Sequence, residues 1–304
     1  MEEIAIFFFT NTGKKSEFSL FSVKIHFFHF IRVKNRLYLM SSLQDSITYK
    51  GKRVVFKNMA LYALGDMHLS FMAHKPMDKF GKVWKNHEEK IEQNCNRIIQ
   101  SGDTFVITGD HSWGRKLADA KPDLEFIANL PGEKILLRGN HDMFWNAKKT
   151  ALLNEQYEPR LHFLQNNYYC YHDYALVGTK GYTFEGPFLI NAKGQIISWN
   201  PDDEKQAQKL VQREAERLRM SFEAAKNAGF KKYIMFLHYP PTNIMEIESV
   251  FTQMAEEYGA EHVVYSHCHG KLRYADSIRG MHHGICYHLV SGDYLNFKPE
   301  KIMD

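Results

Sequence analysis

Five short polar motifs contain the residue types best able to do chemistry. Each motif directly follows a short apolar stretch of the kind that forms a buried strand. In chain order the motifs are Gly65-Asp66-Met67-His68, Gly109-Asp110, Gly139-Asn140-His141-Asp142, His238-Tyr239-Pro240-Pro241 and His267-Cys268-His269. Because ligands of open α/β folds bind at the carboxyl ends of strands, we expect these motifs to meet at one edge of the fold.

The residue types and spacings in these motifs suit divalent metal ions. Asp66 and His68 are two residues apart in an extended segment, so both side chains can reach one ion. Asp110 has two carboxylate oxygens and can bridge two ions, and Asn140 offers a neutral amide oxygen. This mixture of carboxylate, amide and imidazole suits manganese, iron, nickel, cobalt or zinc.

Each motif alone has an ordinary explanation. An isolated Asp-x-His is usually a surface pair, Gly-Asn-His-Asp is typical of a turn, and a histidine before Pro-Pro is typical of a loop. Their joint occurrence at five strand ends favours a metal centre instead. We therefore predict seven metal ligands: Asp66, His68, Asp110, Asn140, His238, His267 and His269.

The ordered set of motifs resembles the calcineurin-like metallophosphoesterase superfamily over residues 61–269. Three further segments resemble a bacterial branch of predicted phosphohydrolases: Lys75-Pro76-Met77-Asp78, Gly109-Asp110-His111-Ser112-Trp113 and Ser291-Gly292-Asp293-Tyr294. The resemblance implies an α/β fold in which two mixed sheets pack face to face between outer helices, a four-layer αββα sandwich. It also implies a dinuclear metal site at the carboxyl ends of the strands.

The resemblance implies a place for each predicted ligand. It gives two ligand sets joined by a bridging aspartate: Asp66, His68 and His269 for the first metal, Asn140, His238 and His267 for the second, and Asp110 between them. The family usually has glycine where Ser266 precedes the last His-x-His motif. Serine is small, so we expect the ligands to reach their places in a tighter loop.

The resemblance also implies two catalytic residues that are not ligands. His141 would lie beside the phosphate as a general acid or as a stabiliser of the leaving group, and Asp142 would orient it. Two divalent ions, with manganese favoured, would clamp a phosphate ester while a hydroxide held between them attacks phosphorus in line. His141 would then protonate the departing oxygen.

Several residues near the motifs are candidates for binding the substrate. Arginine and lysine suit phosphate oxygens, and the full candidate set is Asn140, His111, Arg115, Arg138 and Lys180. The alternative for each charged residue is a solvated surface position. For His111, a packing residue beside Asp110 is the favoured interpretation. Trp113, Trp145 and Tyr182 are candidates to line a pocket, or else to lie in the core or at its rim.

The substrate class has alternatives. A small phosphorylated molecule, for example a nucleotide, fits a phosphodiesterase or a phosphomonoesterase. A nuclease should show a basic groove, and a net charge of +4 without a basic run gives no strong nucleic-acid signal. A non-catalytic interaction module would be expected to lack ligands or His141, yet every position is filled.

Strands alternate with helices from residue 59 onward, which predicts one α/β domain over 59–304. The predicted strands are Leu61–Leu64, Thr104–Thr108, Lys134–Leu137, Tyr174–Val177, Lys232–Leu237, His262–Tyr265 and Cys286–Val290. The predicted helices are Asn86–Gln100, Leu117–Leu130 with an interruption at Pro122, and Asp203–Ala228.

Residues 1–58 differ in composition from the rest of the chain. They are rich in phenylalanine and lysine and have no clean helical or strand period. We predict a non-catalytic extension there, poorly ordered or the result of a mis-assigned start, with Met59 as the natural start. The alternative is a genuine N-terminal arm that packs on the body.

The composition is that of an ordinary globular protein, with 44% hydrophobic and 24% charged residues in a chain of 304. Four scattered cysteines do not form a disulfide framework, and a thiolate ligand at Cys268 is a minor alternative. Neither a transmembrane stretch nor a secretory signal is recognisable, so we expect a cytoplasmic protein with no membrane partner.

Overall fold

The structure is a computed structural model, and it describes most of the chain from residue 59 onward. The described residues are 5–6, 21–22, 28–33, 36–41, 46–49, 52–55, 59–183, 188–190, 196–199, 202–242 and 248–304. The chain divides into two compact units, Met1–Asn58 and Met59–Asp304. Each unit is described by itself.

The described residues of the first unit form three antiparallel strand pairs. They are β1 (Ala5–Ile6) with β2 (Phe21–Ser22), β3 (Phe28–Val33) with β4 (Arg36–Ser41), and β5 (Ser46–Tyr49) with β6 (Lys52–Val55). The prediction that residues 1–58 are an extension, and its alternative of a genuine arm, both stay predictions.

The second unit contains a five-stranded sheet in the order β10-β9-β8-β7-β19. Its strands are β7 (Leu61–Leu64), β8 (Thr104–Ile107), β9 (Glu133–Leu137), β10 (Leu161–Leu164) and β19 (Glu300–Met303). The four strands from β7 to β10 are parallel, and β19 pairs antiparallel with β7 at the edge. Parallel pairing brings the carboxyl ends of β7, β8 and β9 to one edge of the sheet.

A six-stranded sheet follows the order β11-β12-β15-β16-β18-β17. Its strands are β11 (Tyr168–Tyr171), β12 (Tyr174–Thr179), β15 (Lys232–Leu237), β16 (Ala260–Tyr265), β17 (Gly280–His282) and β18 (Ile285–Leu289). The four central strands are parallel, and β11 and β17 are antiparallel edge strands. Both sheets are therefore mixed, as predicted.

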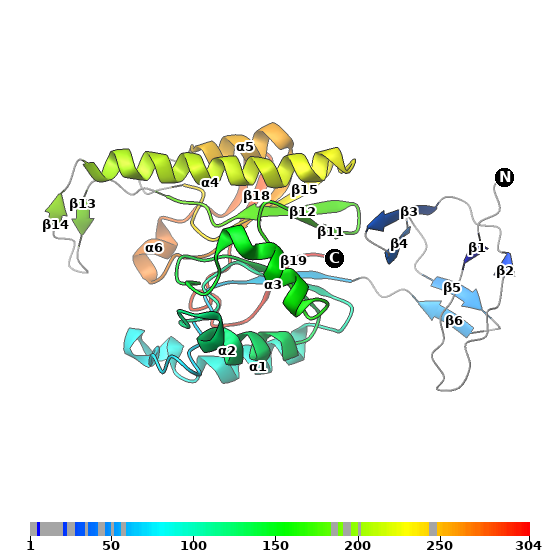
Figure 1. Ribbon diagram of the computed structural model, residues 1–304, viewed down its shortest axis with the longest axis horizontal. Coiled ribbons are helices and arrows are strands. Elements are labelled where there is room, and N and C mark those ends of the chain that lie inside the picture. The colour runs from blue at the N-terminus through cyan, green and yellow to red at the C-terminus, as the bar shows by residue number, and fades with distance from the viewer. Residues whose placement is uncertain are drawn as a thin grey trace. The chain divides into compact units, whose positions relative to one another are not determined.

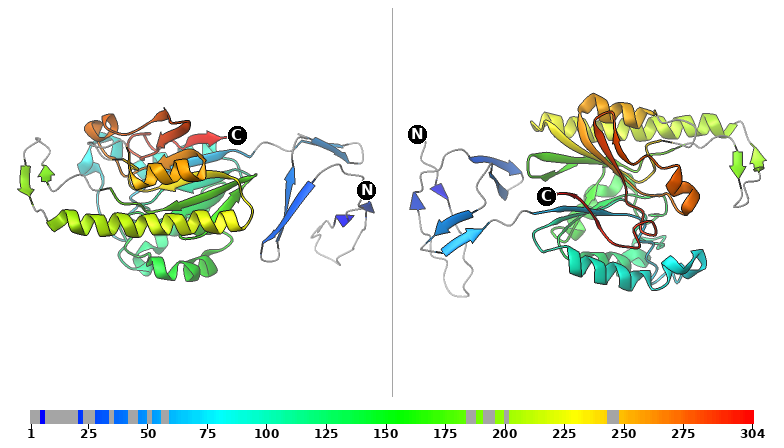
Figure 2. Two further views of the ribbon diagram at one scale, coloured as in Figure 1. Left: turned by 90° about the horizontal axis from the view of Figure 1, so that it is seen from above. Right: turned by 180° about the vertical axis from the view of Figure 1, so that it is seen from behind.

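Helices cover the outer faces of the two sheets (Figures 1 and 2). The helices α1 (His87–Ile98) and α2 (Leu117–Asn129) lie over the five-stranded sheet, and α4 (Asp202–Asn227) and α5 (Val250–Tyr258) lie over the six-stranded sheet. The remaining described elements are α3 (Thr150–Tyr157), α6 (Lys271–Ala275), the β13 (Phe188–Ile190) and β14 (Ile196–Trp199) pair, and three short 3-10 helices, η1 (Asp78–Phe80), η2 (Lys82–Trp84) and η3 (Ala147–Lys149). This arrangement confirms the four-layer αββα sandwich, and α2 continues through Pro122 without the predicted interruption.

Successive side chains of a strand point to opposite faces of its sheet, so one strand contributes both to the core between the sheets and to the core beneath the helices. Leu61 and Ala63 of β7 are buried in the cluster between the sheets, whereas Leu64 belongs to the cluster beneath α1 and α2. Similarly, Val106 of β8 faces the other sheet, and Phe105 faces the helices. Since both faces of each sheet are covered, these strands are apolar on both sides, and their ends are fixed in place.

Candidate metal centre

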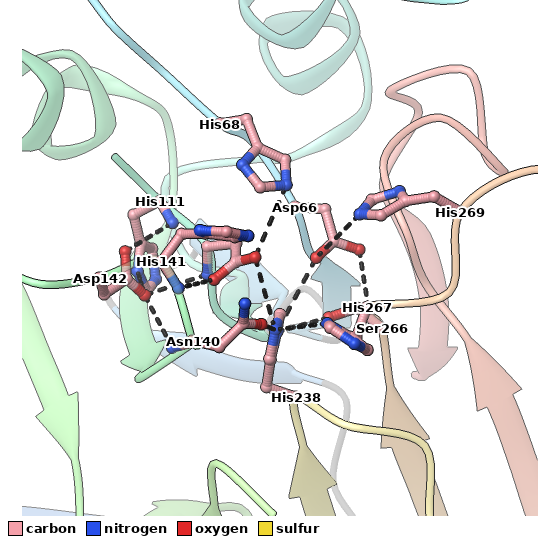
Figure 3. Close-up of polar contacts among 12 residues, drawn as sticks. Asp66, His68, His111, Asn140, His141, Asp142, His238, Ser266, His267 and His269 are labelled. Atoms are coloured by element: carbon pink, nitrogen blue, oxygen red, sulfur yellow. Dashed lines mark hydrogen bonds and ion pairs between the residues drawn. The ribbon is translucent and has the colours of Figure 1, made fainter. Parts of the chain in front are cut away.

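The predicted motifs converge at the carboxyl ends of strands from both sheets (Figure 3). Asp66 and His68 follow β7, Asp110 follows β8, and Asn140 with His141 follows β9. From the second sheet, β15 ends directly before His238, and the His267-x-His269 motif follows β16. The structure brings all seven predicted ligands into one cluster.

The ligand atoms fall into two groups. Those of Asp66, His68 and His269 lie within 4.8 Å of one another, and so do those of Asp110, His238 and His267. Asp110 also lies between the groups, because its Oδ2 is 3.6 Å from His68 Nε2 and 3.5 Å from His238 Nε2. The grouping has the form that the resemblance implies, with one carboxylate facing both sets.

The backbone at these residues adopts an uncommon conformation. Four predicted ligands have positive φ values: Asp66 at 55°, His68 at 45°, Asp110 at 52° and His267 at 70°. Residues other than glycine rarely adopt this left-handed region, which costs about 1–3 kcal/mol per residue and occurs preferentially at functional sites. The surrounding structure therefore holds the ligand backbones in place against a local cost.

Two glycines allow the strand ends to approach closely. A Cβ on Gly139 would lie 2.2 Å from both the backbone N and Oδ1 of Asp110. A Cβ on Gly109 would lie 2.6 Å from His238 Nδ1, and Gly109 has a φ of +103°. Any side chain at Gly139 would therefore displace the carboxylate that faces both ligand groups.

The hydrogen bonds of His238 fix its tautomer. Its Nδ1 lies 2.9 Å from the carbonyl oxygen of Thr108, which can only accept, so Nδ1 carries the proton. The lone pair on Nε2 then faces Asn140 Oδ1 at 2.7 Å and His267 Nδ1 at 3.2 Å. Ser266 supports this arrangement from behind, because its Oγ donates to the same carbonyl at 2.9 Å. The serine thus fits where the family usually has glycine.

Charges and lone pairs at the cluster are suited to a cation. Among the described residues, Asp66 Oδ1 and Asp110 Oδ2 are buried carboxylate oxygens that accept no hydrogen bond. Burial raises the pKa of Asp66 to about 7, and burial together with Asp142 raises the pKa of Asp110 to about 6. Burial also lowers the pKa of His238 to about 3, which keeps its imidazole neutral and able to bind a metal. The donor set therefore fits divalent metal ions.

Asp293 is a residue of the site that the sequence motifs did not identify. Its Oδ1 lies 2.9 Å from His269 Nδ1, and Tyr274 donates its hydroxyl to Oδ2 at 2.5 Å. Burial opposes a charge on His269, but attraction to Asp66 and Asp293 outweighs it and raises the pKa of His269 to about 9. Asp293 thereby orients the imidazole with Nε2 toward Asp66. Its place in a Ser-Gly-Asp-Tyr segment after a late strand was the available signal.

Asp142 has a different partner from the one expected. Its Oδ2 lies 2.8 Å from Nδ1 of the buried His111, and no hydrogen bond joins it to the His141 ring among the described residues. It also accepts backbone N–H bonds from Gly139 and Asp110, at 2.7 and 3.0 Å. Burial would raise the pKa of Asp142, but His111 and these backbone donors lower it to about 2. Asp142 is thus an anchor of two loops rather than the residue that orients His141.

His141 lies at the open side of the cluster. Its backbone N–H donates to Asp110 Oδ1 at 2.8 Å, and its side chain is only partly buried. The imidazole packs on Trp113, with ring centroids 4.3 Å apart, and Trp113 also stacks on His68 at 4.9 Å. Trp113 therefore lines the site, whereas Trp145 is fully buried in the core.

The predicted substrate-binding residues occupy three environments. His111 is fully buried and its ring is hydrogen-bonded to Asp142, so it is not placed where it could touch a substrate. Arg115 is exposed ahead of α2. Lys180 is buried, and its carbonyl accepts from the backbone N–H of His238 at 3.1 Å. Burial lowers the pKa of Lys180 to about 8 and also lowers that of Arg138.

Lys180 and Arg138 belong to a cationic group beside the cluster. Fully buried Glu214 of α4 pairs with Arg217 at 2.6 Å and with Arg213 at 3.2 Å. The charges of Lys180 and Arg138 also interact with the charges of Glu214, Arg213 and Arg217. Four cations therefore share two buried carboxylates, Glu214 and Asp142, and Lys180 and Asp142 both act on His238.

A family model described as calcineurin-like phosphoesterase matches residues 59–271. The chain belongs to this family. Its members are metal-dependent phosphoesterases, and the cluster at the strand ends contains groups of side chains that could hold metal ions. The family match begins at the residue where the second unit begins.

Several solved structures resemble the chain at low sequence identity. A protein of unknown function, AQ665 from Aquifex aeolicus, is 16% identical over 80% of this chain and 96% of its own, with a TM-score of 0.42. Phosphopantetheinyl hydrolase from Mycobacterium tuberculosis is 11% identical over 80% and 95%, with a TM-score of 0.46. TT1561 of Thermus thermophilus is 10% identical over 81% and 98%, with a TM-score of 0.47. No curated protein matches the sequence.

Proposed function

We propose that the protein is a dinuclear metal-dependent hydrolase of small phosphate esters, such as a nucleotide monoester or diester. The observation that carries the proposal is the position of Asp110, whose Oδ2 faces one histidine of each ligand group at 3.5–3.6 Å. A carboxylate in that position can hold two ions side by side. The buried, unbonded carboxylate oxygens beside it support the same interpretation.

The chain's own residues supply positioning and proton transfer. When bound, two divalent ions would neutralise charge on the phosphoryl oxygens and acidify an attacking water. Asp110 is held by the backbone N–H of His141, and His238 is held by Thr108. The His141 imidazole, at the open side of the cluster, is placed to protonate a departing oxygen. Asn140 can contact a phosphoryl oxygen in addition to an ion.

The cationic group of Lys180, Arg138, Arg213 and Arg217 favours a substrate with more negative charge than one ester carries. A second phosphate or a carboxylate on the substrate would find excess positive charge beside His238. The net charge is only +4 and the sequence has no basic run, which favours a small molecule over a nucleic acid. A helix that could span a membrane is absent from the described residues.

Hydrolysis of bis-(p-nitrophenyl) phosphate and p-nitrophenyl phosphate by the manganese-loaded protein tests the proposal. We expect activity in the wild type and a loss of about 100-fold or more in Asp110→Asn and His141→Ala. Glu125→Gln, in an exposed ion pair on α2, is the matched control and should retain full activity. The preferred ester would narrow the substrate class.

Three outcomes contradict the proposal. Equal activity of Asp110→Asn and wild type would show that the hydrolysis occurs elsewhere or comes from a contaminant. Bound manganese without hydrolysis of either ester, or of a nucleotide panel, would favour a binding module. Cleavage of single-stranded or duplex DNA at rates above those for mononucleotides would favour a nuclease.

A further inference from the structure

A second cluster of metal-ligand side chains lies outside the site just described. His262 of β16 and Cys286 and His288 of β18 place their ligand atoms within 4.8 Å of one another. All three side chains are partly buried. We propose that His262, Cys286 and His288 form a separate structural site for a zinc-like ion, supported by Glu300 of the C-terminal strand.

The strand register explains why these residues meet. In the parallel pairing of β16 with β18, His262 lies opposite Cys286. His288 is two residues further along the same strand, so its side chain points to the same face as that of Cys286. Two neighbouring strands therefore present all three side chains on one side of the sheet. No loop has to move to assemble them.

Hydrogen bonding fixes which nitrogen of His288 is available. Its Nδ1 lies 2.8 Å from Glu300 Oε1, and a carboxylate oxygen accepts, so Nδ1 carries the proton. The lone pair therefore lies on Nε2, which points at His262 Nδ1 at 3.0 Å. A carboxylate that holds the far nitrogen of a histidine is the usual support for a metal-binding imidazole.

The spacing is close to what zinc requires. Two imidazole nitrogens at about 2.0–2.1 Å from one tetrahedral zinc ion lie about 3.3 Å apart. The two nitrogens here are 3.0 Å apart, so small side-chain rotations would admit the ion. A cysteine with two histidines is a soft to borderline donor set, which favours zinc over magnesium or calcium. The three side chains are partly buried, so a water can complete the tetrahedral set as a fourth ligand.

The cluster of His262, Cys286 and His288 differs from the candidate metal centre in its residues and in its position. His262 lies within β16, whereas His267 and His269 lie beyond its end at the carboxyl edge. Glu300 belongs to β19, which pairs with β7 in the other sheet. An ion at this cluster would therefore link the C-terminal strand of the five-stranded sheet to two strands of the six-stranded sheet. That position indicates a structural role.

Cobalt substitution tests the site through a signal specific to cysteine. The metal-free, reduced, full-length protein is titrated with Co²⁺ while absorbance is recorded in the near ultraviolet, where a thiolate bound to cobalt absorbs. We expect a thiolate-to-cobalt band that saturates at one equivalent for this site. Cys286→Ser should abolish the band, and His288→Gln should weaken cobalt binding at this site at least 10-fold.

Cys268→Ser is the matched control, because Cys268 lies between two catalytic ligands and is the other cysteine near a metal cluster. We expect this variant, and also Asp110→Asn, to keep the band. In addition, zinc should raise the melting temperature of the wild type more than that of Cys286→Ser, a readout that does not depend on activity.

The proposal is overturned if no thiolate-to-cobalt band appears, or if the band persists in Cys286→Ser. The contacts would then be a chain of hydrogen bonds, in which His262 donates to His288 and His288 donates to Glu300. Serine at a partly exposed position differs by one atom, so a folding failure of Cys286→Ser is not expected. Circular dichroism checks this point, and Cys286→Ala provides a second variant with the same expected loss of the band.

Discussion

The buried carboxylate of Asp142 accepts hydrogen bonds from the loops that follow two different strands. The donors are the backbone N–H groups of Gly139, Asp110, His111 and Ser112 and the ring of His111. The Asp142 side chain therefore fixes the Asp110 backbone. It also fixes the turn that carries Asn140, the predicted ligand two residues earlier. Asp142 can influence catalysis without touching a substrate.

Asp142→Asn should unfold more easily and lose most activity. An amide has one acceptor oxygen, so its NH₂ group would face backbone donors in a fully buried place. We expect a loss of about 3 kcal/mol or more in the free energy of unfolding, measured by urea denaturation. Asp123→Asn is the matched control, because Asp123 is equally buried but accepts from Phe71 and Ser112 on the helix side. Its activity, once folded, should be near that of the wild type.

The same residue predicts a pH dependence of stability. The pKa of Asp142 is about 2 in the folded protein and 3.8 ordinarily. Because the pKa of Asp142 is lower in the folded protein, its carboxylate contributes to the free energy of unfolding. This contribution is fully present above about pH 4 and is lost as the pH falls toward 2. This difference corresponds to about 2 kcal/mol. The metal-free wild type should therefore lose about that much more stability than Asp142→Asn between pH 5 and 2; equal losses would contradict the assigned role.

Asp293 predicts a selective effect on metal binding. Replacing it by alanine frees His269 Nδ1 and removes the contact that orients the ring. We expect affinity for one of two manganese ions to fall by about 10–100-fold, measured by calorimetry, while the other is retained. Tyr274→Phe, which removes only the hydrogen bond to Asp293 Oδ2, should have a smaller effect. Unchanged affinity in Asp293→Ala would exclude a supporting role.

At the residue scale, the sequence identified the side chains that meet at the strand ends better than the residues that support them. Metal ligands need particular residue types at strand ends, so Asp66 and His238 were recognisable from motif and position. The supports are defined by contacts between residues far apart in sequence, such as Asp293 with His269. The predicted partner of Asp142, His141, was wrong for the same reason. His111 and His141 are both adjacent to motif residues, and only the packing of the folded chain decides which of them contacts Asp142.

Among the elements, those with strong apolar patterns were predicted with good bounds. Leu61–Leu64 and Lys232–Leu237 match β7 and β15, and the helix predicted at 203–228 matches α4 within one residue at each end. All four edge strands, β10, β11, β17 and β19, were missed. They are short, and most of their side chains are exposed or only partly buried in β11, β17 and β19. The short α5 was also missed, although Ser249 caps its start and Gly259 ends it in the left-handed conformation.

The turn after β9 predicts a strict requirement for glycine. A Cβ at Gly139 would overlap the Asp110 backbone N and Oδ1 at 2.2 Å. Gly139→Ala should therefore displace Asp110 and lower activity by about 100-fold or more, through a loss of the second metal. The matched control is Gly102→Ala, where the nearest atom to a new Cβ is 3.6 Å away. Manganese content and hydrolysis of p-nitrophenyl esters measure both variants; full activity in Gly139→Ala would contradict the close approach.

At the scale of the whole fold, the parallel strands of both sheets end at a common edge. Five of those ends come from strands that are separate in sequence, and each sheet contributes side chains to both groups of predicted ligands. The resemblance predicted this architecture, because the order of motifs is specific. The lengths and partners of the loops around the site could not be predicted, because they depend on packing between layers.

The boundary between the two units gives the last prediction. Met59 is tied to the second unit, since its carbonyl accepts from Tyr171 at 2.6 Å and the next residue, Ala60, donates to Asp103 at 2.9 Å. A protein consisting of residues 59–304 should therefore fold and hydrolyse phosphate esters with a kcat/KM within about twofold of the full chain. N-terminal sequencing of the native protein gives the complementary measurement, with Met59 or the following residue expected first. A native chain that begins at residue 1 or 2, or a truncated protein that is unfolded or inactive, would favour an N-terminal arm that belongs to the working protein.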